Sequence, residues 1–372
     1  METKTLILPD IFNNVLAGER LSFEDGVALF NSDDLLTIGE MANLVRERKN
    51  GRKTYFVVNR HINYSNICIN RCRFCAFSRD KDAPDAYEFS FNEIMKKAAE
   101  ADKIGATEIH IVGGLHPDLK FDFYLKMISA IKERYPGIHL QAFTAVEIAH
   151  LAEISGRATG DVLRQLQKAG LGSLPGGGAE IFADRVRQAL CSSKLSPDGW
   201  LTIMEQAHEL GIRSNATMLY GQIETYEERV EHLIKLRNLQ DQTGGFMAFI
   251  PLPFHPANTP LTCPAREGEK AEQFTRTSAI DDLKTIAISR LMLDNFDHIK
   301  AFWIMLGVKL AQVSLSFGAD DLDGTVVEEK ITHSAGATTP ESLTRERLVN
   351  LIKETGREAV ERNTLYEVIG NR

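Results

Sequence analysis

Cysteine is scarce in this chain, with five residues among 372. So few thiols in a chain of this length do not make a disulfide framework, which is typical of short secreted proteins. Apolar runs are also short, and none approaches the roughly 20 residues needed to span a bilayer. The first residues, METKTLILPDIF, lack a basic region followed by a long apolar stretch, so no secretory signal is visible. These absences predict a cytoplasmic protein with no membrane partner.

Basic residues are outnumbered, with 43 Lys and Arg against 51 Asp and Glu and a net charge of −8. No basic tract stands out, so nucleic acid is not an expected partner. The length allows a large core, and one barrel with a small appendage fits as well as two domains.

Three of the cysteines are clustered in the segment NICINRCRFCAF: Cys68, Cys72 and Cys75, with three and then two residues between them. Three thiolates can hold three irons of a [4Fe-4S] cube and leave the fourth iron open to a second molecule. A structural zinc site instead wants four closed ligands, usually as two spaced pairs. Cys191 and Cys263 are isolated, so no second pair exists. The spacing therefore favours an iron–sulfur cluster that acts as a reaction centre.

Apolar, β-rich runs alternate with amphipathic helical stretches along the chain, which is typical of repeated βα units. Strands are expected at 53–68 (running into the cysteine loop), 107–114, 138–145, 214–221, 245–252 and 299–306. Helices are expected within 20–48 and at 90–104, 121–135, 159–169, 225–240, 278–294 and 344–356. Six or more such units without an internal repeat predict an α/β fold, a partial or complete TIM-type (β/α) barrel. We expect an N-terminal helical extension (1–52), the barrel (53–324) and a C-terminal extension packed on it (325–372).

Active sites of such barrels form at the carboxyl ends of the strands, so the cluster should lie there. Gly113 and Gly114 directly follow the second strand, where missing side chains let a ligand approach the backbone. A tight turn is the alternative. Three glycines precede Glu180 in PGGGAEIF (175–182), and Glu180 is expected in the first turn of a helix. A carboxylate there suits the helix dipole and can accept hydrogen bonds, although an ordinary helix start is equally compatible.

The cysteine spacing, with Phe74 just before the last cysteine, resembles the signature of the radical S-adenosylmethionine (SAM) enzymes. In that superfamily the open iron binds the amino and carboxylate groups of SAM, which is cleaved to methionine and a 5′-deoxyadenosyl radical. The resemblance implies SAM contacts for Phe74 at the adenine, Gly113 and Gly114 at the amino group, Glu180 at the ribose or ammonium, and Arg187 at the carboxylate. Phe74 as a core aromatic and Arg187 as a solvated charge remain alternatives.

Longer segments resemble the aminofutalosine synthase family of radical SAM enzymes, which belongs to the futalosine route to menaquinone. They are NRHINYSNICINRCRFCAF, VGGLHPDL, LQAFTAVEI, SLPGGGAEIF, FIPLPFHPANTPL, SRLMLDNFDHIKAFWIMLG and DDLDGTVVEEKITHSAGA. The family reaction adds the 5′-deoxyadenosyl group to 3-[(1-carboxyvinyl)oxy]benzoate, with aryl migration and decarboxylation. The related cyclic dehypoxanthinyl futalosine synthases are the alternative, but TAVEI (144–148) and FHP (254–256) resemble the first family more closely.

A dianionic substrate of this kind requires hydrogen-bond donors or cations near the mouth of the barrel. His116, Thr144 and His255 each follow an expected strand and are candidate substrate-binding residues, although each lone histidine can be an ordinary loop residue. The resemblance also implies an external one-electron reductant of the flavodoxin or ferredoxin type. An iron–sulfur or zinc protein without catalysis remains the third class.

Overall fold

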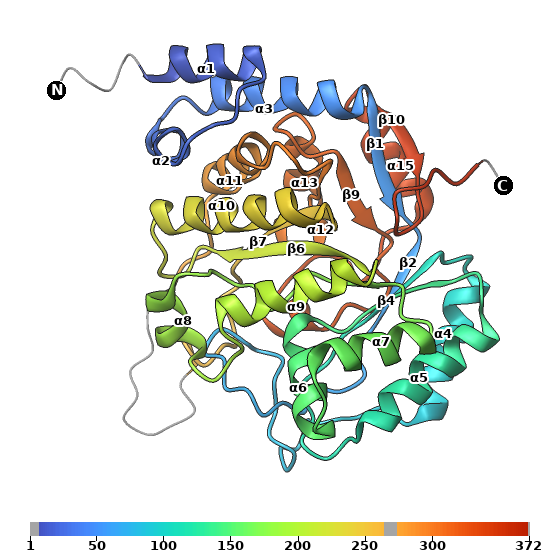
Figure 1. Cartoon of the computed structure of the whole chain (residues 1–372). Coiled ribbons are helices and arrows are strands. Elements are labelled where there is room, and N and C mark those ends of the chain that lie inside the picture. Colours follow the sequence, from blue (N-terminus) through green and yellow to red (C-terminus); the bar gives the residue numbers. More distant parts are fainter. Residues whose placement is uncertain (1–6, 264–273, 371–372) are drawn as a thin grey trace.

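A curled, wholly parallel sheet surrounded by helices forms the body of the computed structural model, which describes residues 7–263 and 274–370 (Figure 1). Its seven strands follow one another in chain order. They are β2 (Asn59–Ile62), β3 (Glu108–Ile111), β4 (His139–Ala142), β5 (Ser173–Leu174), β6 (Arg213–Tyr220), β7 (Phe246–Pro253) and β8 (His298–Ile299). This arrangement confirms the expected partial (β/α) barrel.

Helices lie on the outside of the curled sheet, and three further helices precede it at the N-terminus (Figure 1). The N-terminal helices are α1 (Ile7–Ala17), α2 (Phe23–Asn31) and α3 (Leu35–Asn50). Those that follow barrel strands are α4 (Phe91–Lys103), α5 (Phe121–Arg134), α6 (Ala145–Ser155), α7 (Thr159–Ala169), α8 (Asp184–Cys191), α9 (Pro197–Glu209), α10 (Tyr226–Thr243) and α11 (Ala279–Met292). The last helices are α12 (Trp303–Leu306), α13 (Val308–Ser314), α14 (Ile331–Ser334) and α15 (Arg345–Glu354).

Several helices begin where a short polar side chain caps free backbone N–H groups. Ser90 and Glu93 form a reciprocal capping box at the start of α4, and Thr225 and Glu228 form another at α10. Each box satisfies two N–H groups that have no partner within the helix. Because these signals are local, the sequence predicts where both helices start, and the structure confirms both starts.

A second, three-stranded parallel sheet lies beside the barrel, with the order β10-β1-β9. Its strands are β1 (Lys53–Val57), β9 (Asp321–Gly324) and β10 (Glu358–Glu361). The single strand expected at the start of 53–68 is therefore divided, because β1 pairs outside the barrel and β2 begins two residues later. The chain after β9 also bridges Arg60 of β2 through Val327, and Asp321 bridges Lys300 after β8. C-terminal residues thus contact both edge strands of the barrel sheet, and the three-part division of the chain remains a prediction.

The strand expected at 299–306 is wrong over most of its length. The β8 strand ends at Ile299, and α12 occupies Trp303–Leu306. A short, fully apolar run has no periodicity that separates a buried strand from a buried helical turn. Here the Trp303 indole donates to the carbonyl of Gly324 at 2.8 Å, a contact with a distant strand that the local sequence does not reveal.

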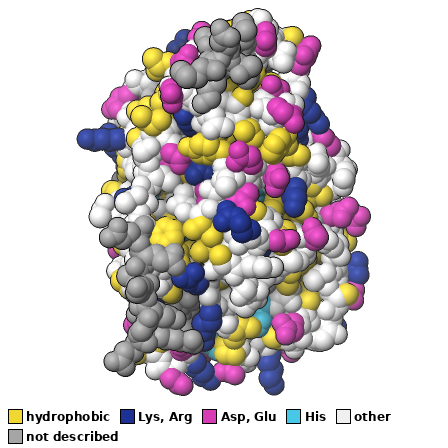
Figure 2. All heavy atoms as spheres, turned by 90° about the vertical axis from the view of Figure 1, so that its left-hand side faces the viewer, with side chains coloured by type: hydrophobic (Ala, Val, Ile, Leu, Met, Phe, Trp, Pro, Cys, Tyr) yellow, Lys and Arg dark blue, Asp and Glu magenta, His cyan; other side chains and the backbone are white. Residues whose placement is uncertain are grey.

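Acidic and basic side chains are interspersed on the face of the molecule seen in Figure 2, as expected for a chain without a basic tract. No helix within residues 7–263 and 274–370 is both long and apolar enough to cross a membrane.

Candidate active site

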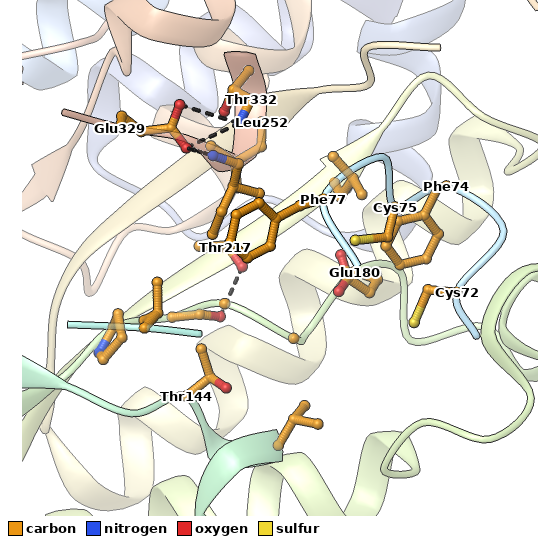
Figure 3. Close-up of a pocket in the computed structure, with 18 of the residues that line it drawn as sticks. Cys72, Phe74, Cys75, Phe77, Thr144, Glu180, Thr217, Leu252, Glu329 and Thr332 are labelled. Carbon is orange, nitrogen blue, oxygen red and sulfur yellow. Dashed lines mark hydrogen bonds between the residues drawn. The ribbon is translucent and has the colours of Figure 1, made fainter. Parts of the chain in front are cut away.

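A cavity of about 350 Å³ opens at the carboxyl ends of the barrel strands. Most of the residues predicted for the site line it: Cys68, Cys72, Phe74, Cys75, Gly113, Gly114, Thr144, Glu180 and His255. In Figure 3, Cys72, Phe74, Cys75 and Glu180 lie together, apart from Glu329 and Thr332 at another part of the wall. Residues far apart in sequence are therefore brought to one place, as barrel geometry requires.

The cysteine loop is held against the glycine pair after β3 by backbone contacts. The N–H of Gly114 donates to the carbonyl of Ser65 at 2.8 Å, and the N–H of Ile69 donates to that of Leu115 at 3.0 Å. A Cβ atom on Gly114 would lie 2.2 Å from the carbonyl oxygen of Ile67 and 3.0 Å from the Cβ of Cys68. Gly114 is thus required for the close approach of the cysteine loop, in addition to any contact with a ligand.

The three thiols suit a cube rather than a single ion. Within the described residues, no three His, Cys, Asp or Glu side chains converge closely enough to hold one metal ion. A [4Fe-4S] cube takes each thiolate on a different iron, so its three ligands need not converge. Burial raises the pKa of Cys72 to about 12 and also raises that of Cys68. Cluster assembly must therefore displace protons from these thiols, because thiolates are the ligands. The donor set fits the group.

A buried carboxylate supports the other side of the glycine pair. Glu147 Oε1 accepts hydrogen bonds from the N–H of Gly113 at 3.1 Å and from the Tyr64 hydroxyl at 2.9 Å. Its Oε2 accepts from the N–H and hydroxyl of Thr144 at 2.8 and 2.9 Å, which caps α6. Burial raises the pKa of Glu147, against these hydrogen bonds. Glu147 therefore ties the start of α6 to the turn at Gly113.

Glu180 lies in the cavity but not in a helix, so the predicted first-turn position is wrong. Its φ of 51° is left-handed, and α8 begins only at Asp184. Its carboxylate forms an ion pair with Lys194, and both side chains are largely buried. Burial by itself lowers the pKa of Lys194, but the neighbouring Glu180 carboxylate raises the same pKa. The net shift is upward, so Lys194 remains a cation. The Lys194 ammonium lies 5.4 Å from the centre of the Phe74 ring.

Arg187 and His116 lie outside the cavity lining. The buried Arg187 guanidinium donates to the backbone carbonyls of Ala179 (2.9 Å) and Leu195, so it supports the loop that carries Glu180. The His116 imidazole accepts hydrogen bonds at Nδ1 from two backbone N–H groups of its own loop. Its Nε2 lies 2.8 Å from Oε2 of Glu88. Burial lowers the pKa of His116. The geometry favours supporting roles for both, and their predicted ligand contacts remain predictions.

Thr144 and His255 do line the cavity. The Thr144 hydroxyl is engaged in the cap of α6, where it donates to Glu147 Oε2 and accepts from the Glu147 N–H, so one lone pair is left for a ligand. The His255 Nε2 lies 2.9 Å from the carbonyl of Met305 and 2.8 Å from the Arg276 guanidinium. Burial lowers the pKa of His255, so a neutral ring is favoured.

Five polar residues that the sequence did not lead us to assign to the site also line the cavity: His61, His110, Gln141 and Asn215 from within the strands, and Lys300 directly after β8. The available signal was a single polar residue between apolar neighbours, as in Ile109-His110-Ile111. Alternation places such residues on the face opposite to their neighbours, but only the curled sheet of the tertiary structure shows that this face is the interior.

The fold and site define a radical SAM enzyme, and comparisons with known proteins agree. The profile of the Radical SAM superfamily matches residues 62–236, and that of the CofH/MqnC C-terminal region matches residues 243–371. The chain is 49% identical to the aminodeoxyfutalosine synthase of Thermus thermophilus, over 96% of this chain and 95% of that protein. It is 45% identical to the aminodeoxyfutalosine synthase of Streptomyces coelicolor, over 97% and 93% of the two chains. The chain therefore belongs to the aminodeoxyfutalosine synthase family of the radical SAM superfamily.

Related enzymes with other names are also similar. The 5-amino-6-(D-ribitylamino)uracil–L-tyrosine 4-hydroxyphenyl transferase of Methanopyrus kandleri is 45% identical over 86% of this chain and 85% of that protein. Among solved structures, the hydrogenase maturase HydG superposes with a TM-score of 0.74 at 17% identity, over 96% of this chain and 76% of that one. Methylornithine synthase (PylB) superposes with a TM-score of 0.72 at 18% identity, over 94% and 97% of the two chains. These low identities support the fold alone.

Membership of the superfamily fixes the cofactors, which are a [4Fe-4S] cluster and SAM. The cavity offers the three thiols for the cluster and, next to them, Phe74, Gly113 and Glu180 for SAM. These individual SAM contacts remain predictions.

Proposed function

We propose that the enzyme is an aminodeoxyfutalosine synthase that acts on 3-[(1-carboxyvinyl)oxy]benzoate. The observation that carries this proposal is the 49% identity to a synthase over nearly the whole of both chains. The products are 6-amino-6-deoxyfutalosine, bicarbonate and methionine, which places the reaction in menaquinone biosynthesis. The same identity favours the synthase over the cyclic dehypoxanthinyl futalosine synthase alternative.

The bound cluster and SAM supply the 5′-deoxyadenosyl radical, and the protein supplies position and shielding. Cys68, Cys72 and Cys75 hold the cluster. Glu180, charge-balanced by Lys194, accepts hydrogen bonds from the ribose or ammonium of SAM. The walls of the cavity would limit the access of water and abstractable hydrogens to the reacting groups.

Transfer rather than hydrogen abstraction requires the vinyl carbon to be held next to the adenosyl 5′ carbon. The cavity has apolar walls that suit an aromatic ring, including Leu219, Ile250 and Leu252. Fixing the two reacting carbons in contact is the main catalytic contribution that such a wall makes. His255 and Thr144 remain candidates for contact with the substrate. An external flavodoxin- or ferredoxin-type protein is the proposed electron donor.

A single incubation tests the proposal. Anaerobically reconstituted, reduced protein is mixed with SAM and the enol ether, and the products are analysed by mass. A product that joins the adenosine and aryl fragments, with methionine formed in equal amount, is expected. Free 5′-deoxyadenosine without a joined product would contradict the synthase assignment. Tyrosine with 5-amino-6-(D-ribitylamino)uracil, the substrates in the name of a 45%-identical relative, is the comparison that should give no joined product.

A further inference from the structure

Polar side chains in or directly after five barrel strands line the interior of the barrel. His61, His110 and Gln141 are each the third residue of β2, β3 and β4, Asn215 is the third residue of β6, and Lys300 directly follows β8. His61 pairs in register with His110, and His110 pairs with Gln141. All five line the cavity, and we refer to them as the polar layer. Bulky aliphatic residues normally fill such layers, so a polar one calls for a function.

Much of the hydrogen-bonding capacity of the polar layer is unused by the described protein atoms. His61 is 7% exposed and stacks on His110 with ring centres 4.5 Å apart, yet neither ring receives a hydrogen bond from the described residues. The amide of Asn215, 3% exposed, has none there either. Lys300 has one described partner, Asp323 at 2.9 Å, which leaves ammonium donors unused. Because these groups line the cavity, a ligand bound there can use their free hydrogen-bonding capacity.

Neutral donors and one cation are available to an anion beside the two histidines, while the three carboxylates nearby each have a partner in the protein. Burial, with His110 and Lys300 nearby, lowers the pKa of His61 well below 6.5, and burial lowers that of His110. Both rings are therefore neutral N–H donors at pH 7. The charged groups that face them are Lys300 after β8, Asp323 of β9, Glu108 of β3, and Glu329 in the segment after β9. The Glu329 carboxylate is itself occupied by the N–H groups of Ile331 and Thr332.

The polar layer lies deeper in the barrel than the cofactor residues. Gly113 is three residues beyond His110 along the same chain, a separation of roughly 10 Å for extended backbone. Beyond Asn215 and Thr217 on β6 the wall becomes apolar toward the mouth, with Leu219 on β6 and Ile250 and Leu252 on the adjacent β7. From the mouth inward, the cavity therefore presents cofactor residues, an apolar wall and a polar end.

We propose that the polar layer binds the ring carboxylate of the aryl enol ether, an inference that rests on the proposed function. The ring carboxylate lies at the end of the substrate remote from the vinyl carbon, whereas the other carboxylate is attached next to it. Anchoring the remote end in the polar layer places the ring against the apolar wall and directs the vinyl carbon toward the mouth. The polar layer thus determines specificity for aryl ethers that carry this carboxylate.

A matched pair of ligands tests the proposal by binding alone. Cluster-loaded, unreduced protein with SAM is titrated anaerobically with 3-[(1-carboxyvinyl)oxy]benzoate and with 2-phenoxyacrylate, which lacks only the ring carboxylate. The wild type should bind the first about tenfold to hundredfold more tightly, the value of one or two charge-assisted hydrogen bonds. His61→Phe, which keeps the ring stack, and Lys300→Met should lose most of this preference by binding the benzoate more weakly. Lys300→Arg should restore part of it.

A buried histidine outside the cavity provides the control. His232 is 1% exposed and stacks on Phe182 with ring centres 4.1 Å apart, but it does not line the cavity. His232→Phe should keep the wild-type preference between the two ligands. Iron content and SAM affinity of every variant are measured in parallel.

The outcomes separate failure of this inference from failure of the proposed function. Equal weakening of both ligands in His61→Phe and Lys300→Met would overturn the carboxylate site, because a merely structural layer does not discriminate between them. No preference in the wild type would also overturn it. Wild-type protein that binds neither enol ether, or binds them and forms no joined product when reduced, would instead overturn the proposed function.

Discussion

The carboxylate of Glu147 accepts a hydrogen bond from the backbone N–H of Gly113 at 3.1 Å. One residue of a helix cap therefore fixes the turn that is predicted to bind the amino group of SAM. The same carboxylate accepts a hydrogen bond from the Tyr64 hydroxyl. The Tyr64 ring packs so closely on Gly113 that a Cβ atom on Gly113 would lie only 2.7 Å from it. Glu147 therefore connects the cap of α6 at Thr144, the turn at Gly113 and Tyr64 before the cysteine loop.

We expect Glu147→Ala to weaken SAM binding and to destabilise the fold by about 1–3 kcal/mol, because it removes the acceptor of the Gly113 N–H and of the buried Tyr64 hydroxyl. SAM titration and thermal unfolding measure the two effects. Glu93→Ala is the matched control, because Glu93 has the same capping role at α4 but is remote from the cavity lining. SAM affinity that falls equally in both variants would contradict the link to Gly113.

Replacing any one of Cys68, Cys72 or Cys75 by Ala should abolish a full cube and all SAM cleavage, because each provides one of three anchoring thiolates. Iron and sulfide content, with the absorbance of the reconstituted protein, measure this. Cys191→Ala and Cys263→Ala serve as controls and should retain the cluster. Large iron loss in either control would indicate an additional cluster.

Glu180→Gln should weaken SAM binding by about 1.5–3 kcal/mol, the value of one charge-assisted hydrogen bond, while the cluster still assembles. It also leaves the buried Lys194 unpaired, which destabilises the fold. The double variant Glu180→Gln/Lys194→Met removes the unpaired charge, so it should recover stability without recovering SAM affinity. Unchanged SAM affinity in the single variant would exclude the proposed contact.

Gly114→Ala should impair cluster assembly, because the new methyl group would meet the Ile67 carbonyl at 2.2 Å. Displacing the cysteine loop to relieve this overlap should cost about 1–3 kcal/mol or more, in the range of overpacked cores. Gly137→Ala introduces a methyl group with no atom within 4 Å and should behave as wild type. Iron content and unfolding temperature give the comparison. Normal cluster loading in Gly114→Ala would show that the loop tolerates the shift.

Acid should destabilise the protein partly through His208. Burial lowers its pKa from 6.5 to about 4, while its ring bonds Thr243 and Ser214 at 2.7 and 2.8 Å. Between these pH values the unfolded chain binds the proton more readily, so stability contributed by the neutral ring is lost as pH falls from 6.5 to 4. His208→Gln should lose up to about 3 kcal/mol less than wild type over this window. Unfolding measured at pH 4.5 and 7.5 tests it, and identical losses would contradict the assignment.

Local signals made much of the fold predictable. Capping residues such as Ser90 and Thr225 mark helix starts within a few residues of sequence. The pairing of β1 in a second sheet was not predictable, because its partners β9 and β10 lie about 270 and 305 residues further along the chain. Likewise, the left-handed φ of Glu180 belongs to a loop that the Arg187 guanidinium supports by a hydrogen bond to the carbonyl of Ala179.

The sequence by itself determined where the cluster is predicted to bind, because its three proposed ligands lie within eight consecutive residues whose spacing suits a cube. It also determined the alternation of strands and helices, because periodicity and caps are local. Only the tertiary structure decided that Lys194 balances Glu180, and that His61, His110, Gln141, Asn215 and Lys300 line one cavity. Those contacts join separate strands and loops, and their positions follow from the register and curvature of the sheet, which no local stretch of sequence specifies.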